Sequence, residues 1–132
     1  MLMTFASNYP RNPLGQIVFP EDRQLRQKIF LSKVEHPAKN NLYLLQELVE
    51  YLTKPGDTIL DPMAGAGSIM YCAQLGRQIV LIEIEQAFVE LLEKNRPGFT
   101  GTITVLHGDC RKILPLTDMF DAIIFSPPYS TS

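Results

Sequence analysis

Residues 57–83 read DTILDPMAGAGSIMYCAQLGRQIVLIE, and this stretch decides the fold class. Two short runs of β-branched and aliphatic residues, 57–61 and 77–83, flank a glycine-rich loop and a segment, Ser68–Leu75, that Gly76 ends. Nearly continuous apolar runs of this length are typical of parallel strands that are buried on both faces. The stretch therefore predicts a strand, a helix and a second, parallel strand.

The same alternation continues towards the C-terminus. A helix is expected at Gln86–Asn95, strands at 102–106 and 120–125, and one helical turn near 111–114. Strands that alternate with helices form an open, doubly wound parallel α/β sheet with right-handed crossovers. The expected strand order is 3-2-1-4. In such sheets ligands bind outside the carboxyl ends of the strands, so the residues that follow each strand are the candidate site.

The N-terminal third is less regular. Residues 1–41 hold four of the ten prolines, and we expect an arm with a short helix at 22–31. Helical spacing of apolar side chains then predicts a helix over 42–52, which Pro55 and Gly56 end. The chain should thus divide into an arm, 1–41, and a sheet domain, 42–132. The inward-facing residues of the helices are expected to be Leu45, Leu48, Val49 and Leu52, and Phe88, Leu91 and Leu92.

Composition excludes several classes of protein. The 132 residues suffice for one domain, and 45% hydrophobic with 20% charged residues is typical of a globular chain. No apolar run approaches the roughly 18 residues of a membrane span, and no secretory signal is visible.

Cys72 and Cys110 are expected to be reduced thiols in a cytoplasmic protein. His36 and His107 form no ligand cluster, so no metal site is predicted. Net charge is −2, although residues 1–54 are mildly basic.

A glycine-rich loop follows the first strand. Gly65 and Gly67, separated by one residue, let the backbone pass close to a ligand, and the next helix begins at Ser68. The dinucleotide fingerprint requires a small residue three positions further on, where this chain has Met70. The pattern for NAD is therefore incomplete, and an ordinary tight turn is the alternative.

Acidic residues follow the next two strands. Glu83 stands where a carboxylate can accept two hydrogen bonds from a ribose diol, whereas Glu85 fits an acid at the start of a helix. Asp109, in the turn after the third strand, could accept from an adenine amino group, although Gly108-Asp109 is also a common turn.

The fourth strand is followed by Ser126, Pro127, Pro128 and Tyr129. The prolines remove two backbone donors and leave carbonyls as acceptors, with a hydroxyl before them and an aromatic ring after them. This layout suits a planar group with an exposed amine, because acceptors hold the amine hydrogens while the ring stacks on the plane. A plain proline-rich loop is the alternative.

These segments resemble the S-adenosylmethionine-dependent DNA amino-methyltransferases, which modify the exocyclic amine of adenine or cytosine. Residues 61–68, Glu83, Asp109 and 126–129 have the order and spacing of that family, and 36–39 is similar to its motif upstream of the glycine loop. The resemblance covers most of the chain. It implies a Rossmann-like methyltransferase fold, of which the first four strands are present, and DNA as substrate, as in restriction–modification systems.

The resemblance also implies roles for single residues. Ser126 and the Pro127 carbonyl would accept hydrogen bonds from the target amine, with Pro128 stiffening the loop and Tyr129 stacking on a flipped base. Glu83 would bind the ribose, and Asp109 the adenine. The residues expected to bind S-adenosylmethionine are Pro37, Ala38, Asp61, Pro62, Met63, Gly65, Gly67, Ser68, Glu83, Ile84, Asp109 and Cys110.

Two departures from the family shape these expectations. The catalytic tetrapeptide begins with Ser126 rather than Asp or Asn, which favours cytosine over adenine as the target. Family members continue past the tetrapeptide with three more strands and a target-recognition region, whereas this sequence ends three residues later. We therefore expect an incomplete catalytic domain, with a homodimer or a missing C-terminal half as its partner. Alone, the chain should self-associate through its fourth strand or be unusually unstable, and it should lack sequence-specific methylation.

Three other functions fit less of the sequence. An RNA methyltransferase that acts on a base amine uses a very similar tetrapeptide, and a non-catalytic cofactor-binding or assembly module would fit a truncated chain. A nicotinamide dehydrogenase is disfavoured by Met70 and by the loop at 126–129.

Overall fold

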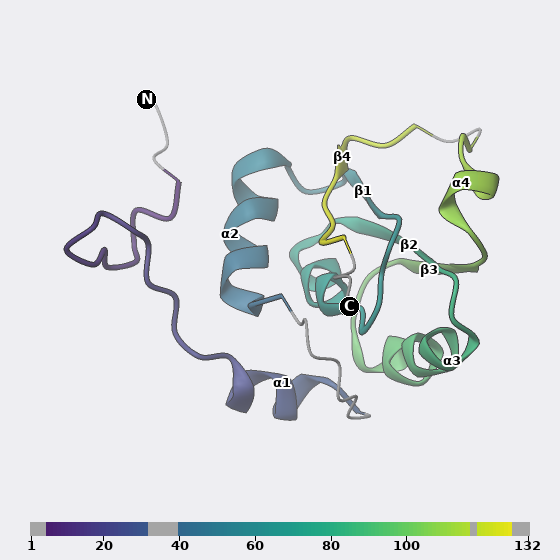
Figure 1. Ribbon diagram of the computed structural model, residues 1–132, viewed down its shortest axis with the longest axis horizontal. Coiled ribbons are helices and arrows are strands. Elements are labelled where there is room, and N and C mark those ends of the chain that lie inside the picture. Colours follow the sequence, from purple (N-terminus) through teal and green to yellow (C-terminus); the bar gives the residue numbers. More distant parts are fainter. Residues whose placement is uncertain (1–4, 32–39, 117–118, 128–132) are drawn as a thin grey trace, which may run out of the picture.

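The computed structural model describes residues 5–31, 40–116 and 119–127. Its elements are, in chain order, α1 (Arg23–Ile29), α2 (Leu42–Leu52), β1 (Thr58–Asp61), the 3-10 helix η1 (Ser68–Leu75), β2 (Gln78–Glu83), α3 (Gln86–Asn95), the 3-10 turn η2 (Arg96–Gly98), β3 (Ile103–His107), α4 (Cys110–Ile113) and β4 (Ala122–Ile123). The four strands form one parallel sheet in the order β3-β2-β1-β4 (Figure 1). The predicted fold class and strand order are confirmed.

The two interior strands, β1 and β2, carry the core. Ile59 of β1 pairs with Ile79 of β2, and both side chains are fully buried. β2 also pairs with β3 as far as the Glu83–His107 pair. Because the strands are parallel, the carboxyl ends at Asp61, Glu83 and His107 meet at one edge of the sheet, and the loops that follow them can form one site.

α2 begins where the sequence predicts. The Asn41 side chain accepts two backbone hydrogen bonds from the first turn, at 2.9 and 3.1 Å, and so caps the helix. Leu45 and Val49 are buried, and α2 packs against η1. The expectation for Leu52 is wrong, since 55% of this residue is exposed. It is the last residue of α2, where the helix leaves the core.

The segment 68–75 is helical as predicted, but it is a 3-10 helix. Gly67 and Gly76 adopt left-handed φ angles of +75° and +84° at its two ends. A glycine with a left-handed conformation therefore stands at each end of the helix that connects β1 to β2. Met70 and Cys72 of this 3-10 helix lie in the core.

The fourth strand is shorter than predicted. β4 has two residues, Ala122–Ile123, where a strand over 120–125 was expected. Its only pairing among the described residues is with β1, so it lies at the sheet edge. Its position at the edge agrees with the expected strand order 3-2-1-4. Ile123 and Phe125 are 57% and 45% exposed, so this edge presents apolar side chains.

The N-terminal arm contacts the sheet domain at several points. The rings of Phe5 and Tyr51 of α2 lie 5.5 Å apart, edge to face. Arg26 of α1 reaches the start of η1, where its guanidinium donates to the Ser68 hydroxyl at 2.9 Å. The helix predicted within the arm is present as α1, while the division of the chain at residue 41 stays a prediction.

Candidate functional site

The loop after β1 turns tightly at the carboxyl end of the sheet. Gly65 and Gly67 have positive φ angles of +54° and +75°. A Cβ on Gly67 would lie 2.3 Å from Cδ2 of Leu92 in α3 and 2.8 Å from the methyl carbon of Met70. A side chain at 67 would therefore displace the ends of the Leu92 and Met70 side chains and hold a left-handed φ, whereas Gly65 lines a pocket.

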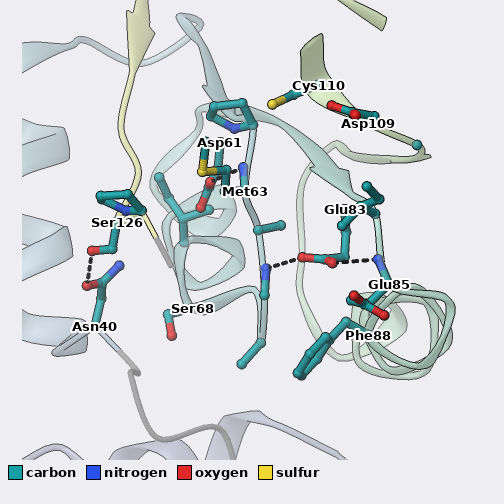
Figure 2. Close-up of a pocket in the computed structure, with 18 of the residues that line it drawn as sticks. Asn40, Asp61, Met63, Ser68, Glu83, Glu85, Phe88, Asp109, Cys110 and Ser126 are labelled. Atoms are coloured by element: carbon teal, nitrogen blue, oxygen red, sulfur yellow. Dashed lines mark hydrogen bonds between the residues drawn. The ribbon is translucent and has the colours of Figure 1, made fainter. Parts of the chain in front are cut away.

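Glu83, the last residue of β2, holds this loop in place. Its Oε1 accepts a hydrogen bond from the Gly65 backbone N–H and its Oε2 one from the Glu85 N–H, each at 2.8 Å (Figure 2). Glu83 is buried but borders the same pocket. Since each carboxylate oxygen carries two lone pairs, both can accept one further hydrogen bond. This carboxylate can therefore bind a pair of neighbouring hydroxyls, as the ribose role requires.

Asp61, the last residue of β1, is a buried carboxyl at the base of the loop. It is 6% exposed, and its Oδ1 accepts a hydrogen bond from the Met63 N–H at 3.0 Å. Burial raises the pKa of Asp61 to about 7, and the nearby Glu83 acts in the same direction, while the Met63 hydrogen bond opposes it. A cationic ligand beside Asp61 would favour its ionised form.

Asp109 begins α4 and belongs to an ion pair. Its carboxylate accepts from the backbone N–H of Arg111 at 2.9 Å and from the guanidinium of the same residue, with Nη2 at 2.8 Å. These hydrogen bonds lower the pKa of Asp109 to about 2. Arg111 already uses the acceptor capacity of this carboxylate, so an adenine amino group would have to displace an 84% exposed guanidinium. The adenine role of Asp109 stays a prediction.

Ser126 follows β4 and lies across the glycine loop from Glu83 (Figure 2), and Pro127 lines the same pocket. The Ile124 backbone N–H donates to the Leu60 carbonyl at 3.0 Å, which keeps this segment against β1. The Ser126 hydroxyl donates to Oδ1 of Asn40 at 2.7 Å. The chain thus brings a hydroxyl and a proline carbonyl group to the same edge of the sheet as Asp61 and Glu83.

One cavity of about 510 Å³ joins these groups. It lies within the range of cavities that hold cofactor-sized ligands. The residues that line it are 40, 61–66, 68, 69, 83–85, 88, 108–111, 126 and 127. After the roles that the sequence predicts for Glu83 and Ser126, we call the part lined by the glycine loop and Glu83 the cofactor end, and the part lined by Ser126, Pro127 and Asn40 the catalytic end.

Most predicted site residues in the described part of the chain line this cavity. They are Asp61, Pro62, Met63, Gly65, Ser68, Glu83, Ile84, Asp109, Cys110, Ser126 and Pro127. Gly67 does not line it and packs against Leu92 instead. Pro37, Ala38, Pro128 and Tyr129 were also predicted, and they lie outside the described residues.

Eight residues that line the cavity were not among the predicted site residues: Asn40, Ala64, Ala66, Ile69, Glu85, Phe88, Gly108 and Arg111. Phe88 and Asn40 are the two that change the description of the site. Phe88 was expected in the inner face of α3, yet it borders the pocket beside Glu85. Asn40 was not singled out, although it precedes α2 directly and follows the segment 36–39 that suggested the upstream motif. A polar side chain next to that motif was the available signal for Asn40.

A family model described as DNA methylase, of the N6/N4 type, matches residues 11–94, more than half of the chain. The chain belongs to this family. The match confirms the resemblance to the DNA amino-methyltransferases that the sequence motifs indicated, and S-adenosylmethionine is the cofactor of that family.

Individual relatives match shorter parts. The chain is 36% identical over 61 residues to the type II methyltransferase M2.DpnII of Streptococcus pneumoniae, which covers 46% of this chain and 23% of that protein. It is 38% identical over 81 residues to a tRNA (guanine(10)-N2)-dimethyltransferase of Methanothermobacter thermautotrophicus, covering 60% of this chain and 24% of that protein. The chain therefore spans about a quarter of the length of these curated relatives.

Among solved structures, TrmN from Thermus thermophilus superposes with a TM-score of 0.60. The match is 22% identical and covers 71% of this chain and 30% of TrmN. At this identity the likeness shows the fold alone, and it agrees with the methyltransferase-type sheet.

In residues 5–31, 40–116 and 119–127, no group of three His, Cys, Asp or Glu side chains is placed to hold a metal ion. Every helix in the same part of the chain is too short or too polar to cross a membrane.

Proposed function

We propose that this chain forms the cofactor-binding and catalytic part of a DNA methyltransferase that methylates the exocyclic amine of a base. One observation carries the proposal: a single cavity is lined by the glycine loop and Glu83 at one end and by Ser126 and Pro127 at the other. A methyl donor and a base amine bound at these two ends would lie in one continuous space.

The residues at the cofactor end fit S-adenosylmethionine. Glu83 offers two acceptor oxygens to the ribose hydroxyls, and Gly65 lets the backbone approach the ligand without a side chain. Asp61 supplies a buried carboxyl that the positive charge of the cofactor would ionise. Ile84 and Phe88 add apolar surface for the adenine ring.

The catalytic end would prepare the amine. S-adenosylmethionine, held by Glu83 and the glycine loop, would supply a methyl group from its positively charged sulfur to the amine nitrogen, with cleavage of the S–C bond and loss of one amine proton to solvent. Ser126 and the Pro127 carbonyl accept hydrogen bonds from the amine, which keeps its lone pair out of the aromatic ring. Positioning then supplies much of the rate, because an error of about 1 Å is costly. Tyr129 remains the expected stacking partner of the base.

The test is transfer of a tritiated methyl group from S-adenosylmethionine to duplex DNA of random sequence and, separately, to structured RNA. We expect label in DNA, recovered as N4-methylcytosine rather than N6-methyladenine because the tetrapeptide begins with Ser126. Label in RNA alone would support the second candidate, which the tRNA-methylating relative favours. Cofactor binding without transfer to either polymer would support a binding module and contradict the proposal.

The same proposal includes the surroundings of the enzyme. We propose a cytoplasmic location, in which Cys72 and Cys110 stay reduced.

The exposed Ile123 and Phe125 at the β4 edge favour association with a second copy or with a further part of the protein. Light scattering over a concentration series checks this: we expect a mass above that of the monomer, and a monomer at every concentration would contradict it.

A further inference from the structure

The hydroxyl of Ser126 has one proton, and the direction of that proton decides what the hydroxyl can do. A serine that donates to its target cannot also help to withdraw hydrogen from an amine. For Ser126 to accept from an amine N–H, its own proton must be held by another acceptor. In this structure that acceptor is Oδ1 of Asn40, at 2.7 Å from the Ser126 Oγ.

We propose that Asn40 is a positioning residue that takes up the hydroxyl proton of Ser126 and so turns the lone pairs of this serine towards the target amine. The inference rests on the proposed function and assigns a role to a residue that the motifs did not indicate. A carboxylate in place of Ser126 would need no such partner, because it carries no proton and only accepts.

The backbone around Asn40 is itself held in place. The Arg26 guanidinium of α1 donates through Nη2 both to the Asn40 carbonyl and to the Ser68 hydroxyl. Nε of Arg26 donates to Asp22 Oδ2 at 3.1 Å, and the same carboxylate oxygen accepts from the Leu42 N–H at 2.8 Å. Asn40 is therefore fixed between α1 and the capped start of α2.

These contacts separate Asn40 from its neighbour. Asn41 uses its side chain to cap α2 and to donate to the Pro20 carbonyl at 2.9 Å, which is a structural role. Asn40 points its amide oxygen into the cavity at Ser126 (Figure 2). A pair of hydrogen-bonded side chains in which one is catalytic and the other orients it is the arrangement seen in other proton-transfer sites.

The test compares Asn40→Leu, which removes the acceptor, with Asn40→Asp, which keeps it. With labelled cofactor and DNA, Asn40→Leu should lower kcat about ten- to a hundredfold, because the serine proton competes for the amine site. Asn40→Asp should stay within about threefold of the parent, and both should bind cofactor as the parent does. Asn12→Leu in the arm, which also removes side-chain hydrogen bonds, is the matched control and should not change kcat.

A double-mutant cycle separates proton orientation from general damage. In a Ser126→Asp background, Asn40→Leu should change kcat less than about threefold, since the carboxylate has no proton to place. Equal losses from Asn40→Leu and Asn40→Asp, or an equal effect of Asn40→Leu in both backgrounds, would overturn the inference.

A measurement without turnover tests the hydrogen bond itself. In a ¹⁵N-labelled chain, Ser126→Ala should shift the side-chain amide resonances of Asn40 and leave those of Asn12 in place. Unchanged Asn40 resonances would overturn the inference. Shifted resonances in a parent chain that methylates neither DNA nor RNA would overturn the proposed function, and the role of Asn40 with it, while leaving the contact established.

Discussion

At the cofactor end of the pocket the polar groups stand at the ends of two interior strands, whereas at the catalytic end Ser126 follows a strand of two residues at the sheet edge. Glu83 is buried and tied to two backbone N–H groups within a short stretch of chain. Ser126 is exposed, and its side-chain partner, Asn40, lies 86 residues away in the sequence. The first end is thus built by local sequence, and the second by contacts between distant segments.

The two ends should respond differently to substitutions. The cofactor end should keep its shape when single contacts are lost elsewhere, because its supports belong to the core of the sheet. The catalytic end depends on the edge strand and on the arm that carries Arg26. Substitutions at the two ends should therefore separate cofactor binding from methyl transfer.

The largest effect is expected at the catalytic end. Ser126→Ala removes an acceptor for the amine, and kcat should fall about a hundred- to a thousandfold. The dissociation constant for S-adenosylmethionine should not change, since Ser126 lies away from Glu83 (Figure 2). Labelled methyl transfer measures kcat and calorimetry measures the dissociation constant, with Ser7→Ala in the exposed arm as the control variant. A matching loss of cofactor affinity would show that the two ends are not separable.

The next largest effect is expected at Gly67, where the glycine loop packs against α3. Gly67→Ala should destabilise the chain by about 2–4 kcal/mol, because the new Cβ would meet Leu92 Cδ2 at 2.3 Å and the residue would keep a left-handed φ of +75°. Gly56→Ala is the matched control: its φ is +93° but nothing lies within 4 Å, so it should cost about 1 kcal/mol. Urea unfolding measures both, and equal costs would mean that packing on α3 is unimportant.

A third prediction concerns pH and Asp61. The pKa of this carboxyl is about 7 in the folded chain and near 3.8 when exposed, so between these values the folded state binds more protons. Stability from Asp61 is therefore full below pH 3.8 and is lost as the pH rises to about 7. Asp61→Asn should raise the free energy of unfolding by about 2–4 kcal/mol at pH 8 and leave it unchanged at pH 3.5.

Urea melts at several pH values check this prediction, with Asp57→Asn in the turn before β1 as control. A variant whose stability follows the same pH dependence as the parent would place the ionised Asp61 in a polar environment and contradict its burial.

The smallest effect is expected at Glu83. Glu83→Gln keeps one oxygen acceptor but turns an NH2 group towards the backbone N–H of Gly65 or of Glu85. It should weaken S-adenosylmethionine binding by about 1–2 kcal/mol, because one acceptor is lost and the other becomes neutral. Glu85→Gln, two residues along the chain, changes an exposed side chain and leaves the Glu85 backbone N–H in place, so it should change the affinity little. Calorimetry distinguishes them, and equal losses would move the ribose site away from Glu83.

The same two ends show what sequence reasoning could and could not predict. The strands and helices of the sheet and the carboxylates at Asp61 and Glu83 follow from local patterns, because each strand and its loop are contiguous in the chain. The strand order was expected from the doubly wound fold class and not from a local pattern. The sequence did not predict that Gly67 packs against other side chains. Its contacts with Leu92 and Met70 form only when α3 and the 3-10 helix pack against the loop.

At the catalytic end the sequence predicted Ser126 and Pro127, which line the cavity, but a strand that was too long. An apolar run at 120–125 looks like a central strand, whereas pairing on one side only leaves β4 with two residues. The contact between Ser126 and Asn40 could not be predicted, since no periodic or spacing signal links residues so far apart in the chain. Long-range contacts of this kind are set by the tertiary fold.

We propose that the glycine loop and Glu83 bind S-adenosylmethionine. The most direct measurement is a titration of the ¹⁵N-labelled chain, followed through the amide signals of Gly65 and Glu85, whose N–H groups donate to the Glu83 carboxylate. We expect both signals to shift and to saturate at one equivalent of S-adenosylmethionine, and to stay in place with NAD. Saturable shifts with NAD, or a folded chain whose Gly65 and Glu85 signals ignore S-adenosylmethionine, would contradict the claim.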